Sequence, residues 1–196
     1  MTMQQNEIEK IANRVLSDFG ITSSPFSHLK QICKKEKIIM KKASFSSQMD
    51  GAFSVINGDK YIFFNPSMSD GRKNFTKAHE LGHFFLNHQL ESGDAIWCYN
   101  NCISENDQWS LPRIETEANW FATFFLMPRQ MIIDEFRNIA CILGIGISRP
   151  LYVDNQNCNA IYWNLVSRHF ATRFGVSKEA LGYRLNKIGL INYNVK

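Results

Sequence analysis

The sequence has an ordinary globular composition and a small positive charge. Its 196 residues are 44% hydrophobic and 20% charged, with a formal net charge of +4. This composition excludes a largely disordered chain, and the charge gives no independent support for nucleic-acid binding. The longest aliphatic stretch, residues 139–147, is far shorter than the roughly 20 residues that span a bilayer, and the opening residues have no signal-peptide pattern. We therefore expect one cytoplasmic domain over residues 1–196.

The five cysteines cannot all pair, and in the cytoplasm they are expected to be reduced thiols. Cys98 and Cys102 are four positions apart, which raises the alternative of a second metal site or a redox pair. Because no matching pair occurs elsewhere in the sequence, we favour an ordinary loop.

The first elements are predicted to be helices over residues 6–36. Apolar residues recur at helical spacing from Ile8 to Phe19, and Gly20 stands where a C-terminal cap is expected. A sheet should follow over residues 38–65, because the dipeptide Asn57-Gly58 separates two apolar, strand-forming runs. We expect this sheet to be small and mixed or antiparallel.

Two further helices are expected within residues 70–127. Ser69 or Asp70 can cap the first of them, whose end should fall within residues 87–93. A polar segment over about residues 90–110 is interpreted as a loop. The second helix is bracketed by two prolines and is expected from Pro112 to about Leu126.

The C-terminal part is predicted to be helical over residues 160–191. The stretch FGVSKEALGYRLNKIGLI contains a turn, a cap at Ser177 and a terminal helix. Residues 138–160 show no clear period and receive no assignment. With its helices and its one small sheet, the chain is expected to be α+β.

The helix that begins near Asp70 carries the pattern HELGH. In a helix, His79 and His83 project from one face, one turn apart, which suits two ligands of a single metal ion. Glu80 is offset from that face and can reach a water on the ion, so we interpret it as a general base. A pair of surface or core histidines is the simpler alternative, but the glutamate between them favours the metal site. Gly82 would leave room there for another helix or a substrate.

A third ligand is expected from the Pro112 helix, which offers Glu115 and Glu117. Glu115 shares its face with small or polar residues, including Asn119 four positions later, so this face can approach another helix closely. Glu117 lies about 200° further round, beside bulky aromatic residues. We therefore assign Glu115 to the metal, although a solvated carboxylate is the usual fate of a glutamate. Asn119 is then free to hydrogen-bond a ligand histidine.

This ligand set predicts hydrolysis of a peptide bond. Zinc held by two imidazoles and one carboxylate activates water, and Glu80 would transfer the proton from that water to the leaving amine. Manganese or iron are alternatives to zinc. Arg184, Tyr183 and His169 are candidates for stabilising the oxyanion. An edge of the hairpin beside the metal could hold an extended protein substrate.

The stretches FTKAHELGHFFLNH and ETEANWFATFFLMPRQ, followed by FGVSKEALGYRLNKIGLI, resemble the ImmA/IrrE family of zinc metallopeptidases. The resemblance implies a zincin-like core of gluzincin type, in which a small sheet packs on the HExxH helix and on a second ligand-bearing helix. It matches Glu115 to the third zinc ligand, Glu80 to the general base and Asn119 to the residue that orients a ligand histidine. It also implies a cytoplasmic protease that cleaves a helix-turn-helix transcriptional repressor and so relieves repression.

Two other functions are weighed against this one. The terminal helix could meet DNA through Lys178, Tyr183, Arg184 and Lys187, but the low net charge argues against direct nucleic-acid binding. A toxin-antitoxin or scaffold protein could keep zinc for structure, which would require a fourth protein ligand. His88 is the available candidate, and five residues beyond His83 it is expected instead behind the ligands or at the surface.

Overall fold

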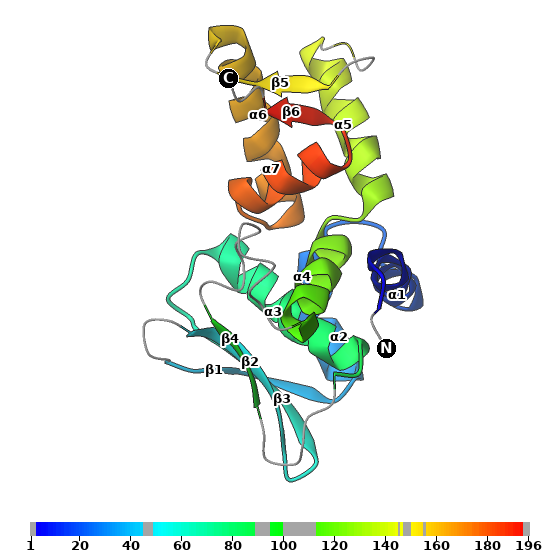
Figure 1. The fold of residues 1–196 in the computed structure, drawn as a ribbon, viewed down its shortest axis with the longest axis vertical. Helices are drawn as coiled ribbons and strands as arrows, with labels where there is room; N and C mark the ends of the chain where they lie inside the picture. Colours follow the sequence, from blue (N-terminus) through cyan, green and yellow to red (C-terminus); the bar gives the residue numbers. More distant parts are fainter. Residues whose placement is uncertain are drawn as a thin grey trace.

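The computed structural model describes residues 3–44, 49–88, 95–99, 113–144, 146, 150–154 and 156–193, and for residues 95–99 only the backbone. The described residues form an α+β fold with a small mixed sheet and a helical C-terminal part, as the sequence predicted. Figure 1 shows two tiers: the sheet with the first four α-helices below, and the last three helices with a two-stranded sheet above. The elements are α1 (Gln5–Asp18), the 3₁₀ helix η1 (Pro25–His28), α2 (Leu29–Lys35), β1 (Ile38–Lys42), β2 (Met49–Ile56), β3 (Asp59–Phe64), α3 (Asp70–Phe85), β4 (Ala95–Tyr99), α4 (Arg113–Leu126), α5 (Arg129–Leu143), β5 (Leu151–Val153), α6 (Asn157–Phe174), α7 (Lys178–Lys187) and β6 (Ile191–Tyr193).

The four-stranded sheet has the order β1-β3-β2-β4. The β1 strand is parallel to β3, whereas β2 is antiparallel to both β3 and β4. The hairpin predicted at Asn57-Gly58 is confirmed: both residues have positive φ angles, 53° and 84°, which the tight turn between β2 and β3 requires. Each hairpin strand has a neighbour on its outer side, so the expectation of a free hairpin edge is wrong. Among the described strands, β1 and β4 form the edges.

Three strands, β4, β5 and β6, and one helix, α5, were missed by the sequence patterns. The β4 strand lies inside the segment interpreted as a loop over residues 90–110, so that interpretation is wrong at residues 95–99. The unassigned residues 138–160 include the end of α5, all of β5 and the start of α6. The β4 strand has five residues, and β5 and β6 have three each. Strands this short hardly establish an alternating pattern, and β5 gains its hydrogen bonds from the distant β6.

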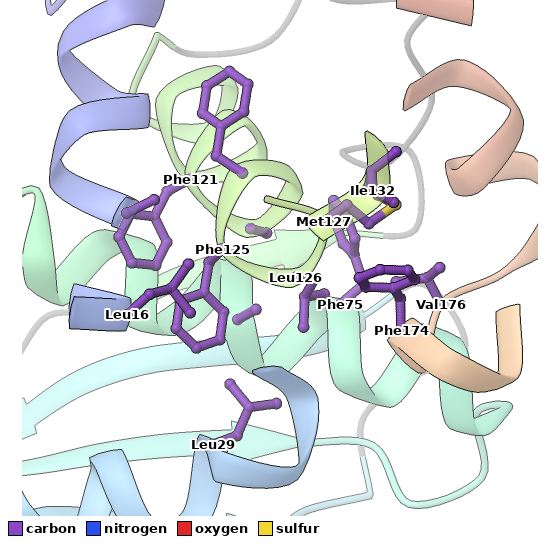
Figure 2. Close-up of a cluster of buried hydrophobic side chains, with 14 of the residues drawn as sticks. Leu16, Leu29, Phe75, Phe121, Phe125, Leu126, Met127, Ile132, Phe174 and Val176 are labelled. Carbon is purple, nitrogen blue, oxygen red and sulfur yellow. The ribbon is translucent and has the colours of Figure 1, made fainter. Parts of the chain in front are cut away.

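The α4 helix supplies the centre of the hydrophobic core. Phe121, Phe125 and Leu126 are fully buried on it, and the first two rings stack with their centroids 5.9 Å apart. Figure 2 shows these side chains between residues of α1 and α2, of α3, and of the segment that joins α6 to α7. Burial of one large apolar side chain stabilises the fold by about 1.5–3 kcal/mol. The core therefore fixes α4, and with it the residues on its first turns.

The upper tier is attached to the lower one by specific polar contacts. Arg184 on α7 donates hydrogen bonds to the carbonyl oxygen of Met127 and, at 3.2 Å, to the carboxylate of Glu9 on α1. Asn74 on α3 donates to the carbonyl oxygen of Gly175 at 2.9 Å. No described helix is long and apolar enough to cross a membrane.

Candidate metal centre

The site is built where α3 and α4 cross, and a glycine permits their close approach. A Cβ atom on Gly82 would lie 3.2 Å from the Cα atom and from the carbonyl oxygen of Ala118. Any larger side chain at position 82 would separate the two helices. As expected from the sequence, the glycine leaves room for another helix, and this brings the first turn of α4 beside the histidines of α3.

Three side chains from these helices converge on one point. The Nε2 atoms of His79 and His83 are 3.0 Å apart, and oxygens of Glu115 lie 3.1 Å from the first and 3.4 Å from the second. Ligands at 2.0–2.1 Å around a tetrahedral zinc ion are separated by about 3.3 Å. All three residues are buried, and they form the group of described residues that could hold a metal ion. Their donor atoms and spacing fit a small divalent cation.

The two imidazoles have opposite electrostatic environments. Burial lowers the pKa of His79, but the hydrogen bond to Glu115 and the charges of Glu80 and Glu115 outweigh it and raise this pKa to about 9. Burial, together with the charges of His79 and His88, keeps the pKa of His83 well below its usual range. A positive charge on one of two adjacent imidazoles disfavours protonation of the other, unless a further negative group offsets the repulsion.

Asn119 contacts the outer nitrogen of His79. Its side-chain oxygen lies 2.8 Å from Nδ1 of His79, one helical turn beyond Glu115 on α4. When the amide oxygen accepts this bond, Nδ1 carries the hydrogen and the lone pair on Nε2 points towards the ligand group. This is the contact that an orienting role requires.

Glu80 is fully buried between α3 and β2. A Cβ atom on Gly51 of β2 would lie 2.9 Å from Oε1 of Glu80 and 2.5 Å from Cγ2 of Thr76. Only glycine at position 51 therefore leaves the carboxylate in this place. The carboxylate of Glu80, the expected general base, therefore lies against the sheet, and Glu80 directly follows His79 in α3.

The comparison with known families agrees with this geometry. The family model Peptidase_M78, described as an IrrE N-terminal-like domain, matches residues 33–186, which is well over half of the chain. The chain belongs to the Peptidase_M78 family. The match includes both helices that carry the ligand group, and it confirms the resemblance to the ImmA/IrrE proteins. A metallopeptidase type of function follows at the level of the family. Comparison with curated proteins finds no match.

This Peptidase_M78 chain carries a further histidine behind the ligand pair. The α3 helix ends at Phe85, slightly before the predicted range, and Asn87 adopts a positive φ of 54°. The amide of Asn87 then donates to the carbonyl of Phe84 and the amide of His88 to that of His83, the two bonds of a Schellman motif. The chain therefore turns back over the last helical turn, and Nδ1 of His88 comes to 2.8 Å from Nδ1 of His83.

Glu117, set aside as a ligand, is also part of this surrounding group. It is buried, and one oxygen lies 3.3 Å from Nε2 of His88 while the other accepts a 2.7 Å bond from Arg113. Burial lowers the pKa of His88, and the bond to Glu117 offsets only part of this effect. The sequence placed His88 and Glu117 on α3 and α4 but gave no reason to pair them. The asparagine at position 87, which often ends a helix with a positive φ, was the available signal.

The suggested oxyanion residues lie elsewhere. Arg184 is bound to the carbonyl oxygen of Met127, just after α4, whereas Glu115 lies in the first turn of that helix, so the helix rise separates the backbone of Glu115 from that of Met127 by about 18 Å. His169 pairs with Glu135 on α5, and Tyr183 is exposed on α7. Within the described part of the chain, no hydrogen bond or ion pair joins these three residues to the ligand group.

Proposed function

We propose that the protein is a zinc-dependent metalloendopeptidase of gluzincin type. His79, His83 and Glu115 would hold one zinc ion, and Glu80 would act as the general base. The observation that carries the proposal is the convergence of three side chains in a member of a metallopeptidase family: the Nε2 atoms of His79 and His83 are 3.0 Å apart, and one oxygen of Glu115 lies 3.1 Å from the first and the other 3.4 Å from the second. Two imidazoles and a carboxylate are a common catalytic donor set for zinc, although manganese or iron can occupy similar sites.

In the proposed reaction, the zinc ion and the protein side chains would have separate roles. A zinc ion at this site would supply a Lewis acid that lowers the pKa of a water molecule and polarises the substrate carbonyl. Glu80 would accept the proton of the attacking water and donate it to the leaving amine. Asn119 would hold the His79 ring with its hydrogen on Nδ1. His79 would then keep the orientation in which Nε2 faces the ion.

The substrate is proposed to be a protein segment in an extended conformation. The β4 strand lies at one edge of the described sheet, and its Cys98 pairs with Gly51, where the absence of a Cβ atom leaves room for the carboxylate of Glu80. A peptide that added to β4 would run along the side of the sheet nearest the general base. We therefore propose β4, rather than a strand of the hairpin, as the edge to which the peptide adds.

We further propose that the natural substrate is a helix-turn-helix transcriptional repressor in the cytoplasm. This step is supported by the resemblance to the ImmA/IrrE family, and cleavage would relieve repression.

The alternative of a regulator with a structural metal site receives less support. A structural zinc site needs a fourth protein ligand. His88, the candidate for it, directs Nδ1 at the outer nitrogen of His83 and so stands behind that ring. For DNA binding, Arg184 was one of four expected contacts, and it is buried and ion-paired with Glu9.

The test compares wild-type protein with Glu80→Gln. Each would be co-expressed with the repressor-like protein encoded nearest to its gene, and that protein would be examined by intact-mass analysis. A single cut made by the wild type only, with equal zinc content in both proteins, is expected. The exposed Glu179→Gln on α7 is the matched control and should cut like wild type. Zinc content near zero in the wild type, or cutting that survives Glu80→Gln, would contradict the proposal.

A further inference from the structure

Four side chains form a hydrogen-bonded series that runs outward from His83, one of the two proposed ligand histidines. Nδ1 of His83 lies 2.8 Å from Nδ1 of His88, and Nε2 of His88 lies 3.3 Å from Oε2 of Glu117. Arg113 then donates from Nε to Oε1 of Glu117 at 2.7 Å. This hydrogen-bonded series connects the buried His83 to the half-exposed guanidinium of Arg113 at the start of α4.

The donor and acceptor of every hydrogen bond in this series follow from its outer members, Arg113 and Glu117. An arginine can only donate, and an ionised glutamate can only accept. Glu117 therefore accepts from His88, whose hydrogen must be on Nε2. A neutral His88 then has a lone pair on Nδ1, and His83 has to donate its Nδ1 hydrogen to it. As a result, the lone pair of His83 is on Nε2, the atom that faces His79 and Glu115.

We propose that His88, Glu117 and Arg113 are positioning residues that hold His83 in the tautomer and orientation required for metal binding. The inference rests on the proposed metal site and extends it outward from the ligands. His79 has a neutral orienting partner, Asn119, at 2.8 Å. His83 would have a histidine backed by a carboxylate, a stronger arrangement because the negative charge makes the ligand nitrogen more basic.

The burial of Glu117 supports this role. Its side chain is 5% exposed and that of His88 is 6% exposed. Removing a carboxylate from water is unfavourable unless charged or hydrogen-bonded partners compensate. Arg113 and His88 are the partners of this carboxylate among the described residues, and a cation held by His83 would add a second positive group beyond His88. A metal ion on His83 would thus account for the burial of the Glu117 carboxylate.

The upper tier contains a group of the same residue types that serves as a matched control. His169 and Arg173 on α6 both pair with Glu135 on α5. His169 is 44% exposed, and it belongs to no metal-binding group among the described residues. The same substitutions in the two groups therefore separate a general loss of packing from a specific effect on the metal.

The primary test measures zinc affinity by competition with a chromogenic chelator. His88→Phe and the isosteric Glu117→Gln are each expected to weaken binding about 10- to 100-fold. His169→Phe and Glu135→Gln should bind zinc like wild type. His88→Asn, whose side-chain oxygen can replace Nδ1 as the acceptor, should retain more affinity than His88→Phe. Thermal unfolding of every variant would verify that each is folded.

A second readout follows the tautomer itself. In zinc-loaded protein, long-range proton-nitrogen spectra of the histidine rings should show slowly exchanging Nδ1 hydrogens on His79 and His83. In His88→Phe the His83 hydrogen should exchange rapidly, while that of His79 should not change.

The outcomes separate this inference from the proposed function. Wild-type protein that binds no zinc would contradict the metal site itself. Tight binding in wild type, lost in His79→Ala but unchanged in folded His88→Phe and Glu117→Gln, would overturn the positioning role alone. An equal loss in His88→Asn and His88→Phe would also overturn it, because packing rather than the hydrogen bond would then explain the effect.

Discussion

The lower tier and the upper tier each contain a histidine, a glutamate and an arginine in mutual contact, yet the two groups differ in what surrounds them. His88 and Glu117 are almost fully buried, and the second ring nitrogen of His88 meets a ligand histidine. The side chain of His169 is about half exposed, and its contact with Glu135 joins α6 to α5. Residue type alone therefore does not define a functional group. Burial fixes the direction of hydrogen bonds that water would otherwise exchange.

The contrast extends to the apolar surface of the two tiers. The lower tier buries Phe121 and Phe125 in the core around α4, and among its described residues the most exposed large apolar side chain is Ile56 at 43%. The upper tier exposes large apolar side chains, among them Ile142 at 81% and Ile161 at 59%. We expect chemical probes and substitutions to affect the two tiers unequally.

The largest difference should appear in the reactivity of the cysteines. Cys33 is buried in the lower tier, where burial, partly offset by the charge of Lys77, raises its pKa from 9.0 to about 12. Cys141 and Cys158 are exposed in the upper tier. At pH 8 the raised pKa lowers the thiolate fraction of Cys33 about a thousandfold. Iodoacetamide labelling followed by peptide mass spectrometry should therefore modify Cys141 and Cys158 and leave Cys33 intact in folded protein.

The direction in which folding stability changes with pH follows from the raised pKa of Cys33. Because the folded state holds the Cys33 proton more tightly, this thiol favours folding below about pH 9, and that contribution is lost as the pH rises towards 12. Labelling of Cys33 should appear in denaturant and in alkali. Native labelling at pH 8 as fast as that of Cys158 would contradict its burial.

The next largest effect is expected at the junction of the tiers. Arg184→Met removes the bond to Met127 and leaves the partly exposed Glu9 without its ion-pair partner. We expect a loss of about 2–3 kcal/mol in the free energy of unfolding, below the 3–5 kcal/mol typical of fully buried pairs. Arg137→Met, on an exposed arginine paired with Asp134, should change stability by less than about 0.5 kcal/mol.

Denaturant titration measures both arginine variants. The suggestion that Arg184 stabilises the oxyanion makes the opposite forecast, in which turnover of folded protein falls while stability is unchanged. Unchanged stability in Arg184→Met would therefore contradict the structural role of this residue.

A smaller effect on stability, with a specific effect on activity, is expected at Gly51. An alanine there would place its Cβ atom 2.5 Å from Thr76 and 2.9 Å from both the Glu80 carboxylate and the carbonyl oxygen of Phe63. We expect a destabilisation of about 2 kcal/mol and a fall in peptidase activity larger than the fall in zinc affinity, because Glu80 moves while the ligands remain. Gly146→Ala in the upper tier meets no atom within 4 Å and should be neutral. Equal activity in both variants would show that Glu80 does not depend on this space.

Much of the metal centre follows from local sequence, because a helix fixes which side chains share a face. Helical periodicity and the small residues beside Glu115 were enough to group His79, His83 and Glu115 as candidate ligands, and the structure brings these three side chains together. A place behind the ligands was one of two positions expected for His88, but its pairing with Glu117 did not follow, since His88 reaches His83 through a chain reversal at Asn87 and Glu117 arrives from another helix. The β4, β5 and β6 strands were missed for a similar reason: their partners are distant in sequence. Local patterns predict faces of helices better than contacts between them.

The smallest predicted difference concerns the first residues of two helices. Ser177 caps α7, and its side-chain oxygen accepts a 3.2 Å bond from the amide of Ala180. Ser69 has the same position before α3, but its side chain makes no capping hydrogen bond. Ser177→Ala should therefore cost about 1 kcal/mol, and Ser69→Ala only a few tenths. Chemical denaturation of both variants measures the difference. Equal losses would mean that the N-cap position, rather than the hydrogen bond, determines the stability of these helices.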